Sequence, residues 1–439
     1  MEVKWIEKIK KNEEFVPQLS SALNIDPFLA QILCNRNITS FDKAKKFFRP
    51  SLDDLHDPFL MMDMEKAVKR LDEALENEEK ILIFGDYDVD GTTATALMFQ
   101  FVSQFTSKIE YYIPNRFKEG YGISEASIEY ANTNNFGLVI ALDCGIKSVD
   151  LIDKANTLNV DYIICDHHLP GDKIPKAKAV LNPKRKDCSY PFKELCGCGV
   201  GFKLAQAYCI FKNIDENNVF QYLDLVTVAI AADMVEISDE NRALCYYGME
   251  KLKKEPCTGL SSLVVNLKYP EINTVSDIVF KIAPRINAAG RMKSGNMAVK
   301  LLIEKNEELA IKIAESIESD NNLRRELDSS ITESALEMLV NDPEFETKNS
   351  TVVSDPNWHK GVVGIVASRL IESYYRPTIV LCEKDGLITG SARSVGNFNI
   401  HTAIESCVHL LENFGGHHMA AGLTLKKENL KEIREQLSK

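Results

Sequence analysis

The chain has 439 residues, of which 45% are hydrophobic and 26% are charged, and its formal net charge is −12. At roughly 150 residues per domain this length predicts two or three domains with buried cores, which excludes a disordered or fibrous chain. No apolar run is long enough to span a bilayer, and the charged N-terminus lacks the apolar stretch of a signal peptide. We therefore expect a soluble, cytoplasmic protein without membrane contact.

The charge balance and the cysteines narrow the class of protein further. An acidic chain is not suited to coating nucleic acid nonspecifically, because that binding depends on Lys and Arg neutralising phosphates, although a local basic groove remains compatible with it. The eleven cysteines are dispersed along the chain rather than arranged in a disulfide framework, which favours a reducing compartment.

The first 80 residues carry helical patterns. Ser40 precedes the segment 43–48 as a helix cap, and residues 63–75 repeat apolar positions at helical spacing. Short apolar runs then alternate with helical patterns: strands are predicted at 81–84, 138–142 and 162–165, and helices at 93–105, 148–158 and 200–211. This alternation predicts an α/β fold with a parallel sheet.

Gly and Pro clusters at 284–295 close this first α/β region, and helices are expected over 298–340. A second α/β pattern follows, with strands at 351–354, 378–382, 387–392 and 420–425 and helices at 361–374 and 401–411. The predicted organisation is an N-terminal helical segment (1–75), a parallel-sheet domain (76–295), a helical linker (296–345) and a smaller α/β domain (346–439), with a cleft between the two α/β domains.

Three carboxylates follow the first predicted strand, in the segment GDYDVDGTTA at 85–94. If the chain stays extended, Asp86, Asp88 and Asp90 lie on one face. Three clustered like charges call for a cation, and hard oxygen ligands suit Mg²⁺ or Mn²⁺. The alternatives are a solvated acidic loop or a Ca²⁺ loop. An EF-hand loop would need Glu where Leu97 stands and a helix where the apolar strand precedes.

Two later strands end in further candidate ligands. Asp143 ends the second predicted strand, and Asp166, His167 and His168 end the third. Parallel sheets bind ligands outside the carboxyl ends of their strands, so these side chains are expected at one rim, where imidazole shifts the preference from Ca²⁺ toward Mn²⁺. Asp233 ends an apolar stretch and is a further candidate ligand. Its alternative role is a surface acid at the end of a helix.

Together these residues predict two metal ions bridged by a carboxylate, an arrangement typical of phosphoester hydrolysis. No Gly-x-Ser-x-Gly segment or reactive Cys-His pattern supports a nucleophilic Ser or Cys. Cys196 and Cys198, with Cys188 and Cys209 nearby, are an alternative zinc site, but their spacing lacks the Cys-x₂-Cys pattern and indicates a glycine turn into a helix.

Cationic and glycine-rich positions are candidate substrate contacts. They stand beside Gly or small residues that let a phosphodiester approach, and they are Arg116, Arg285, Asn287, Arg291 and Arg393. Each arginine taken alone is more often a surface residue. The segment GGHHMAAG at 415–422 combines Gly415 and Gly416, interpreted as a flexible turn, with His417 and His418.

The motifs GDYDVDG, ALDCG, CDHH, AADM and GGHHMAAG, in that order, resemble the DHH phosphoesterase superfamily with its DHH-associated C-terminal domain. Within the superfamily, HDPFLMMDMEKAV, YYIPNRFKEGYG, PRINAAGR, HKGVVGIVASR and GSARS resemble the RecJ family. The resemblance covers the chain from about residue 5 to residue 425. It makes the parallel-sheet domain the DHH catalytic domain and the smaller domain the DHH-associated, substrate-binding domain.

The resemblance implies a metal-dependent exonuclease that degrades single-stranded DNA from 5′ to 3′, releases 5′-mononucleotides and acts in recombination and repair. Its cofactors would be two Mn²⁺ or Mg²⁺ ions, held by Asp86, Asp88, Asp90, Asp143, His167 and Asp233, with Asp143 as the bridge. His168 would contact the scissile phosphate, and Asp166 would orient the histidines. Other residues would bind the strand: Arg116, Ser391 and Arg393 at the 5′ phosphate, Arg291 with His417 or His418 along the strand, and Arg285, Asn287, Gly415 and Gly416 as further contacts.

One departure from the family and two alternatives remain. Family members usually continue into an OB fold that holds single strands, whereas the sequence given ends at Lys439, as either a core piece or a natural short form. We expect the chemistry to persist, and the sequence leaves processivity and length preference open. The first alternative is a phosphodiesterase for short oligonucleotides (nanoRNA) or cyclic dinucleotides. The second is a noncatalytic scaffold of the replication complex. A single-strand-binding protein or a helicase is the candidate protein partner.

Overall fold

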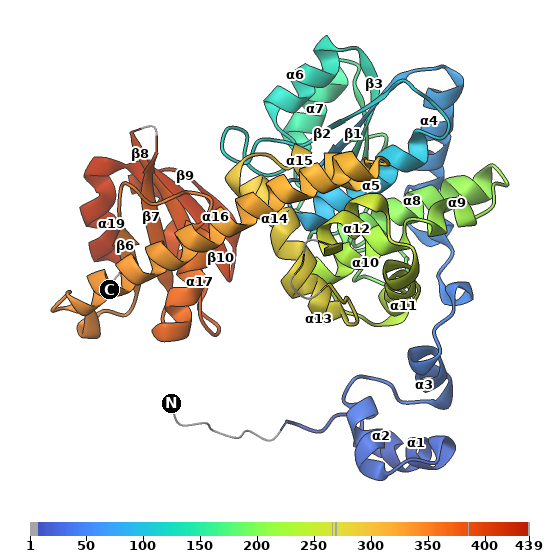
Figure 1. Ribbon diagram of the computed structural model, residues 1–439, viewed down its shortest axis with the longest axis horizontal. Coiled ribbons are helices and arrows are strands. Elements are labelled where there is room, and N and C mark those ends of the chain that lie inside the picture. The colour runs from blue at the N-terminus through green and yellow to red at the C-terminus, as the bar shows by residue number, and fades with distance from the viewer. Residues whose placement is uncertain (1–7, 266, 268–269, 385, 438–439) are drawn as a thin grey trace. The chain divides into compact units, whose positions relative to one another are not determined.

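The computed structural model describes residues 8–265, 267, 270–384 and 386–437, so the first seven residues of the expected N-terminal segment lie outside it. The chain divides into two compact units (Figure 1). The first comprises residues 1–290 and 294–315, and the second comprises residues 291–293 and 316–439. None of the helices in the described ranges combines the length and the apolar character needed to span a bilayer.

The N-terminal part of the first unit is helical, as predicted. Its elements are η1 (Glu13–Phe15), α1 (Val16–Leu23), α2 (Pro27–Cys34), α3 (Phe41–Phe48), η2 (Leu52–Asp54), η3 (Pro58–Leu60) and α4 (Met64–Glu76). The Ser40 side chain accepts a hydrogen bond from the Lys43 N–H at 3.3 Å, which confirms the predicted cap. Helices α1 to α3 enclose a small core of their own, built around Leu19, Leu33 and Ile38.

A buried ion pair fastens the segment after η2 to the rest of the unit. The His56 N–H donates to Glu240 Oε1 at 2.8 Å, and the His56 carbonyl accepts from Lys203 Nζ at 2.7 Å. Lys203 and Glu240 are themselves 2.7 Å apart, and both side chains are 0% exposed. Tyr190 donates its hydroxyl to the second Glu240 oxygen at 2.5 Å. The segment is therefore held through its backbone by charges that have no access to water.

The centre of the first unit is a fully parallel sheet, as predicted, and it has five strands. Its strands are β1 (Lys80–Gly85), β2 (Ile109–Tyr112), β3 (Phe136–Leu142), β4 (Asp161–Cys165) and β5 (Ala179–Leu181), in the order β2-β1-β3-β4-β5. The three strands expected from the sequence are present. Strands β2 and β5 were missed because β2 is only partly buried and mixes polar with apolar residues, and β5 has only three residues.

Helices cover both faces of this sheet, which explains why β1, β3 and β4 are almost continuously apolar. Side chains of α6 (Glu125–Thr133) and α7 (Val149–Thr157) pack on the face that carries Phe84, Val139 and Ile164. Helices α4, α5 (Val89–Val102) and α8 (Gly197–Phe211) also contact the strands. The remaining helices of the unit are α9 (Asn217–Phe220), α10 (Leu223–Ala232), α11 (Asp239–Lys254), α12 (Thr258–Val265), α13 (Val275–Asp277), η4 (Ile278–Ile282), α14 (Ala283–Met292) and α15 (Asn296–Ile303).

Two expectations for the first unit are corrected. Helix α5 begins at Val89, four residues before the predicted start, with Asp88 as its N-cap, so Asp86, Asp88 and Asp90 do not share one face of an extended strand. The Gly- and Pro-rich segment 284–295 is mostly the helix α14. Pro284 comes just after the π-helical turn η4, which itself continues α13, so the proline lies within one uninterrupted helical stretch that changes from π to α geometry just before it.

The second unit contains a mixed five-stranded sheet with a core on each face. Its elements are η5 (Phe345–Thr347), β6 (Thr351–Ser354), α17 (Val363–Ser373), β7 (Thr378–Lys384), β8 (Leu387–Arg393), α18 (Ile400–Glu405), η6 (Val408–Leu410), β9 (Leu411–His417), β10 (Ala420–Lys426), η7 (Lys427–Asn429) and α19 (Leu430–Leu437). The strand order is β6-β7-β8-β10-β9, with β6 and β7 parallel and the other pairs antiparallel. Helix α16 (Glu307–Val340) precedes this sheet, and its last third packs with α17 on one face.

The predicted helix at 401–411 is wrong in its second half. Helix α18 ends at Glu405, and strand β9 begins at Leu411. The sequence concealed β9 because Glu412 and Asn413 interrupt the apolar alternation and Gly415 and Gly416 resemble a turn. The strand is nevertheless paired over its length with β10.

The start of α8 is packed closely against the end of β3. A Cβ atom at Gly197 would stand 2.5 Å from the Cβ of Asp143 and 2.7 Å from its Cα, closer than side chains tolerate. Two residues later, a Cβ at Gly199 would meet only Leu195 and Cys196, at 3.4 Å or more. Only the first glycine is therefore required by the packing.

We predict opposite effects for alanine at these two glycines. Gly197→Ala should lower the free energy of unfolding by about 1–3 kcal/mol because β3 or α8 must shift. Gly199→Ala, the matched control, should leave stability unchanged or raise it by up to about 1 kcal/mol because Gly is unfavourable within a helix. Denaturant unfolding of both variants measures the difference, and equal stabilities would contradict the close contact.

Candidate metal centre and substrate strip

Acidic side chains gather where the strands of the parallel sheet end. Asp86 follows β1, Asp143 follows β3 and Asp166 follows β4. The strand order places β1 beside β3, and the chain crosses in opposite directions on either side of this pair. Ligands of open parallel sheets bind at such a switch point, so the topology brings Asp86 and Asp143 to the expected position.

Helix termini hold the next two carboxylates. Asp88 caps α5 by accepting a hydrogen bond from the Gly91 N–H at 3.0 Å. Asp90, in the first turn of α5, accepts from the Gly197 N–H at 2.6 Å and from the Cys198 N–H at 2.7 Å, both at the start of α8. The α8 N-terminus therefore fixes the Asp90 carboxylate at the sheet rim.

His167 lies among three carboxylates. Its Nε2 atom is 3.2 Å from Asp143 Oδ1, 3.6 Å from Asp233 Oδ2 and 3.7 Å from Asp90 Oδ2. Asp143 adopts a left-handed backbone conformation with φ of 61°, and its carbonyl accepts a hydrogen bond from the Tyr121 hydroxyl at 2.7 Å. Asp233 is the C-cap residue of α10 and also lies beside His167. Its position therefore agrees with both roles considered from the sequence, an acid at a helix end and a candidate metal ligand.

Asp166 orients both histidines. Its Oδ1 accepts from the N–H groups of His167 at 2.7 Å and His168 at 3.0 Å, and from the His168 ring Nδ1 at 2.8 Å. Its other oxygen accepts from the Ile146 N–H at 2.9 Å. Because the carboxylate accepts the hydrogen bond of Nδ1–H, the Nε2 atom of His168 is left for another partner.

These side chains fit a divalent cation. Two groups bring ligand atoms within 4.8 Å of one another: Asp143 with His167 and His168, and Asp90 with His167 and Asp233. Asp143 Oδ1, Asp86 Oδ2 and His167 Nε2 are buried and make no hydrogen bond with any described residue. Unsatisfied buried oxygen and imidazole ligands beside one another are what Mn²⁺ or Mg²⁺ would satisfy. Asp86 and Asp88 lie outside both groups, although Asp86 has this unsatisfied oxygen.

The carboxylates are held together at an electrostatic cost that a cation would relieve. Burial, with the charges of Asp233 and Asp88, raises the pKa of Asp90 to about 8. Burial and the charge of Asp88 raise the pKa of Asp233 to about 6. Burial and neighbouring carboxylates also raise the pKa of Asp86 and of Asp143 well above the usual range. Without a metal, each of these carboxyls therefore keeps its proton to a higher pH than an exposed Asp does.

The two adjacent histidines are shifted in opposite directions. Burial and the neighbouring His168 lower the pKa of His167 to about 4, which keeps it neutral, as a metal ligand must be. Burial also disfavours a charge on His168, but the hydrogen bond and charge of Asp166 outweigh it and raise the His168 pKa. The same contacts outweigh burial at Asp166 and lower its pKa. Opposite shifts of this kind mark different chemical roles.

The cysteine alternative does not fit the structure. Cys196 caps α8, with its Sγ accepting from the Gly199 N–H at 3.3 Å, and the Cys198 N–H holds Asp90. Burial and the charge of Asp90 raise the pKa of both thiols well above their usual range, which disfavours the thiolate that zinc requires. The metal-capable groups found among the described residues contain no cysteine.

Three of the substrate candidates lie in the first unit. The guanidinium of Arg116 lies 4.9 Å from the centre of the Tyr87 ring, and Tyr87 follows Asp86 in the sequence. The positive charge of Arg116 lowers the pKa of the Asp86 carboxyl in opposition to burial. Arg285, on α14, donates to the Lys281 carbonyl at 2.6 Å, and Asn287 stands on the same helix. Arg116 is thus close to the metal centre, whereas Arg285 takes part in helix contacts.

The second unit brings several of the other candidates into one strip. The register pairs Ser391 with Gly422 and Gly422 with Gly415, and pairs Arg393 with Ala420 and Ala420 with His417. Paired residues of neighbouring strands point to the same face, so two rows run across β8, β10 and β9. Arg393 donates to Ser391 Oγ at 2.7 Å. We call Ser391, Arg393, Gly415, His417, Ala420 and Gly422 the substrate strip.

Three expectations for this region are refined. Gly415 and Gly416 are not a turn but lie within β9, and the turn is at His418 and Met419. His418 leaves the strip, since its ring lies 3.1 Å from the Asn397 carbonyl. Arg291 lies 3.5 Å from the Gly361 carbonyl at the segment that leads into α17.

Some contacts at the metal centre could not be found by motif reasoning. The Tyr121 hydroxyl reaches the Asp143 carbonyl and lies 3.3 Å from His168 Nε2. Asn182, after β5, donates to the His168 carbonyl at 2.9 Å. The backbone donors at Gly197 and Cys198 are invisible in a sequence. Tyr121 stands in the segment YYIPNRFKEGYG, which offered the one usable signal.

Comparisons with known proteins show the family to which this chain is related. The DHH family, N-terminal domain, matches residues 80–230, and the DHHA1 domain matches residues 348–439. The single-stranded-DNA-specific exonuclease RecJ of Bacillus subtilis is 38% identical over 98% of this chain and 54% of its own length. RecJ of Escherichia coli is 33% identical over 94% of this chain and 74% of its own length.

Solved structures give the same relationship. RecJ of Thermus thermophilus in complex with Mn²⁺ superimposes with a TM-score of 0.84 at 26% identity, covering 98% of this chain and 61% of that one. An exonuclease RecJ bound to manganese superimposes with a TM-score of 0.78 at 28% identity, covering 88% of this chain and 95% of that one.

The chain thus spans about half the length of the Bacillus subtilis relative. Two findings identify its family: the matches to the DHH and DHHA1 domains, and the likeness to the Escherichia coli enzyme over most of both chains. The chain therefore belongs to the RecJ family of the DHH superfamily.

Proposed function

We propose that this chain is a metal-dependent exonuclease that degrades single-stranded DNA from the 5′ end and releases 5′-mononucleotides. The observation that carries the proposal is the cluster of Asp90, Asp143 and Asp233 around His167 at the switch point of the sheet, in a member of the RecJ family. Relatives named single-stranded-DNA-specific exonucleases support the substrate class. Crystal structures of RecJ with Mn²⁺ and with Mg²⁺ support these two cations.

The residues that we propose would hold the metal ions are Asp86, Asp88, Asp90, Asp143, His167 and Asp233. Bound Mn²⁺ or Mg²⁺ would polarise the scissile phosphate and lower the pKa of the attacking water. Residues of this chain hold the ligands in fixed positions. The α8 N-terminus fixes Asp90, and Tyr121 and Gly197 fix the backbone of Asp143. Burial keeps His167 neutral and able to coordinate.

We assign His168 to the scissile phosphate. Its Nδ1 donates to Asp166, and that contact favours the protonated ring, so Nε2–H can donate to a phosphoryl oxygen whose negative charge increases during hydrolysis. Asp166 acts as a positioning residue because its oxygens hold both histidine N–H groups and the ring.

The DNA contacts are assigned to two surfaces, one in each unit. Arg116 beside the metal centre, and Ser391 and Arg393 of the substrate strip, are proposed to bind the 5′ phosphate. Gly415, Gly416, His417, Arg291, Arg285 and Asn287 are proposed as further contacts. Glycines and Ala420 leave the floor of the strip low, which lets a sugar-phosphate backbone approach β9 and β10. His418 is the weaker candidate of the histidine pair because it engages the Asn397 carbonyl.

We further propose the domain boundaries 1–75, 76–295, 296–345 and 346–439, a cytoplasmic location, a role in recombination and repair, and a single-strand-binding protein or a helicase as the protein partner. The family relationship supports these assignments. The short-oligonucleotide phosphodiesterase and the noncatalytic scaffold are outcomes that the following experiment distinguishes.

The first test is hydrolysis of a 3′-labelled, 5′-phosphorylated single strand of about 30 nucleotides, its duplex and a trinucleotide, with Mn²⁺ or with EDTA. We expect Mn²⁺-dependent shortening of the long single strand, with the duplex spared. Asp143→Asn, which tolerates the left-handed backbone, should lose activity by about a thousandfold or more, because a metal ligand supplies several kcal/mol. Cleavage of the trinucleotide alone would show the short-oligonucleotide class, and inactivity on every substrate would favour the scaffold.

We predict that Arg393→Ala weakens the preference for 5′-phosphorylated ends. The loss of a guanidinium–phosphate contact should raise KM for a 5′-phosphorylated strand by about tenfold or more and should change KM for the 5′-hydroxyl strand little. Lys426→Ala, at the opposite end of the same sheet, is the matched control and should leave both values unchanged. An equal loss on both substrates would remove Arg393 from the 5′-phosphate pocket.

The pKa values of the metal centre predict how stability varies with pH. Asp90 and Asp233 have folded-state pKa values of about 8 and about 6, above the value near 4 of an unfolded Asp. Their protonation stabilises the metal-free fold at low pH, and this contribution is lost as pH rises through 6 and 8. In EDTA, Tm should therefore fall by several degrees between pH 5.5 and 8.5.

Adding Mn²⁺ should reverse this trend, because the cation binds the deprotonated carboxylates. The increase in Tm caused by Mn²⁺ should be larger at pH 8.5 than at pH 5.5, and Asp143→Asn should abolish most of it. Thermal unfolding at three pH values with and without Mn²⁺ measures both effects. A metal-free Tm that rises across this range would contradict the assigned ionisation.

A further inference from the structure

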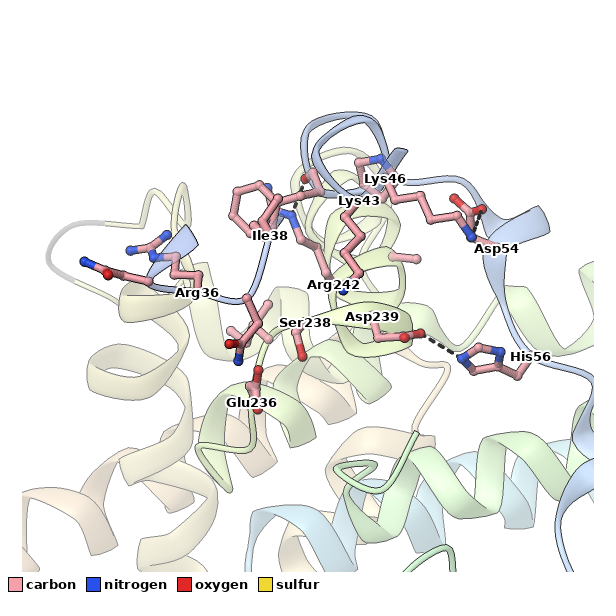
Figure 2. A pocket seen from close by; sticks show the side chains of 16 residues that line it. Arg36, Ile38, Lys43, Lys46, Asp54, His56, Glu236, Ser238, Asp239 and Arg242 are labelled. Atoms are coloured by element: carbon pink, nitrogen blue, oxygen red, sulfur yellow. Dashed lines mark hydrogen bonds and ion pairs between the residues drawn. The ribbon is translucent and has the colours of Figure 1, made fainter. Parts of the chain in front are cut away.

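A pocket of about 580 Å³ lies between the N-terminal helices and the start of α11 (Figure 2). Residues of α3 and the preceding loop form one wall, and the segment 236–243 forms the other. None of the proposed metal ligands lines it. Its volume is within the range of roughly 300–1,000 Å³ that is usual for small-molecule sites.

Four cations line this pocket, and only one of them forms an ion pair within the described chain. Lys46 pairs with Asp54 at 3.0 Å. Arg36 and Lys43 form no ion pair with a described residue, and both side chains are exposed to the pocket and to solvent. Of the acids on the opposite wall, Asp239 is paired with His56 at 2.9 Å. Uncompensated positive charge therefore collects at Arg36 and Lys43.

The fourth cation, Arg242, is fixed in place. Its Nε donates to the Phe47 carbonyl, and its guanidinium lies 3.8 Å from the centre of the Phe47 ring. Burial lowers the pKa of Arg242, and the charge of Arg36 lowers it further, so the two guanidinium groups repel each other. An anion between them would relieve that repulsion.

The remaining walls suit a ring and its polar edge. Ile38, Phe47 and Ile237 supply apolar surface. Figure 2 shows Glu236 across the pocket from Lys43 and Lys46. The Glu236 carboxylate makes no hydrogen bond or ion pair within the described chain, so it is available as an acceptor. The cations that line the pocket, its apolar surface and the Glu236 carboxylate match the phosphate, the ring and the exocyclic amino group of a nucleotide.

We propose that this pocket binds a nucleoside 5′-phosphate, with Arg36, Lys43 and Arg242 around the phosphate and Glu236 accepting from an exocyclic amino group of the base. The same nucleoside 5′-phosphate group occurs in a free mononucleotide and at the 5′ end of a DNA strand, and the experiment below distinguishes these two sources. The proposal does not depend on the exonuclease activity, since no proposed metal ligand takes part.

The test is calorimetric titration of the full chain, in EDTA, with dCMP, dTMP, inorganic phosphate and a 5′-phosphorylated oligodeoxycytidine. We expect dCMP to bind more tightly than dTMP, which has a carbonyl in place of the amino group, and more tightly than phosphate. The double variant R36Q/K43Q should weaken dCMP binding by about tenfold or more. Lys45→Gln is the matched control because Lys45 is exposed on α3 and does not line the pocket.

Each outcome of these titrations either identifies the source of the ligand or rejects the proposal. Asp143→Asn should bind dCMP like the unmodified chain, which separates this pocket from the metal centre. Binding of the oligonucleotide but not of dCMP, with the same dependence on Arg36 and Lys43, would identify a strand end as the source. Unchanged affinity in R36Q/K43Q, or phosphate binding as tight as dCMP binding, would overturn the proposal, as would no binding of either nucleotide at about 10 mM.

Discussion

The dominant constraint on the metal centre is the repulsion between buried carboxylates that the fold holds close together. Asp86, Asp90 and Asp143 are almost completely buried, and neighbouring carboxylates, Asp88 in all three cases, raise the free energy of ionising them. The parallel sheet imposes this arrangement because its carboxyl ends meet at one rim. Backbone N–H groups, including those of α8 at Asp90, and the charge of Arg116 compensate part of this cost permanently. A bound cation would supply the rest and would make the site responsive to metal.

This constraint explains why the surrounding chain is so closely packed. A Cβ at Gly91 would meet the Asp86 backbone at 2.5 Å, and a Cβ at Gly197 would meet Asp143 at the same distance. Carboxylates that repel each other would move apart if close packing did not prevent the backbone that carries them from shifting. Glycine allows helices α5 and α8 to approach the strand ends closely enough to block them. Packing of the backbone, rather than attraction between side chains, therefore sets the geometry of the site.

Much of this fold could be predicted from the sequence, for physical reasons that differ between elements. Strands β1, β3 and β4 are buried on both faces and appear as apolar runs, and their terminal acids stand out for that reason. Strand β9 could not be predicted because Glu412, Asn413 and two glycines conceal its alternation, although β10 pairs with it along its length. The early start of α5 was also hidden, since Asp88 serves both as a candidate ligand and as a helix cap.

The site was less predictable than its list of acids suggests. Spacing alone could not show that Asp90 is bound by α8 or that Tyr121 reaches Asp143, because these contacts join residues far apart in the chain. It also could not separate His417 from His418. That distinction came from strand register, which places His417 in the row of Arg393 and turns His418 toward Asn397.

The buried pair of Lys203 and Glu240 has a consequence for local opening of the chain. Both charges bond to the backbone of His56, so peeling this segment away would leave two ions in an apolar interior with part of their hydrogen bonding lost. The segment between the N-terminal helices and α4 therefore cannot fray as an ordinary surface connection does. Its amide hydrogens should exchange with solvent at rates closer to those of α8 and α11 than to those of a loop.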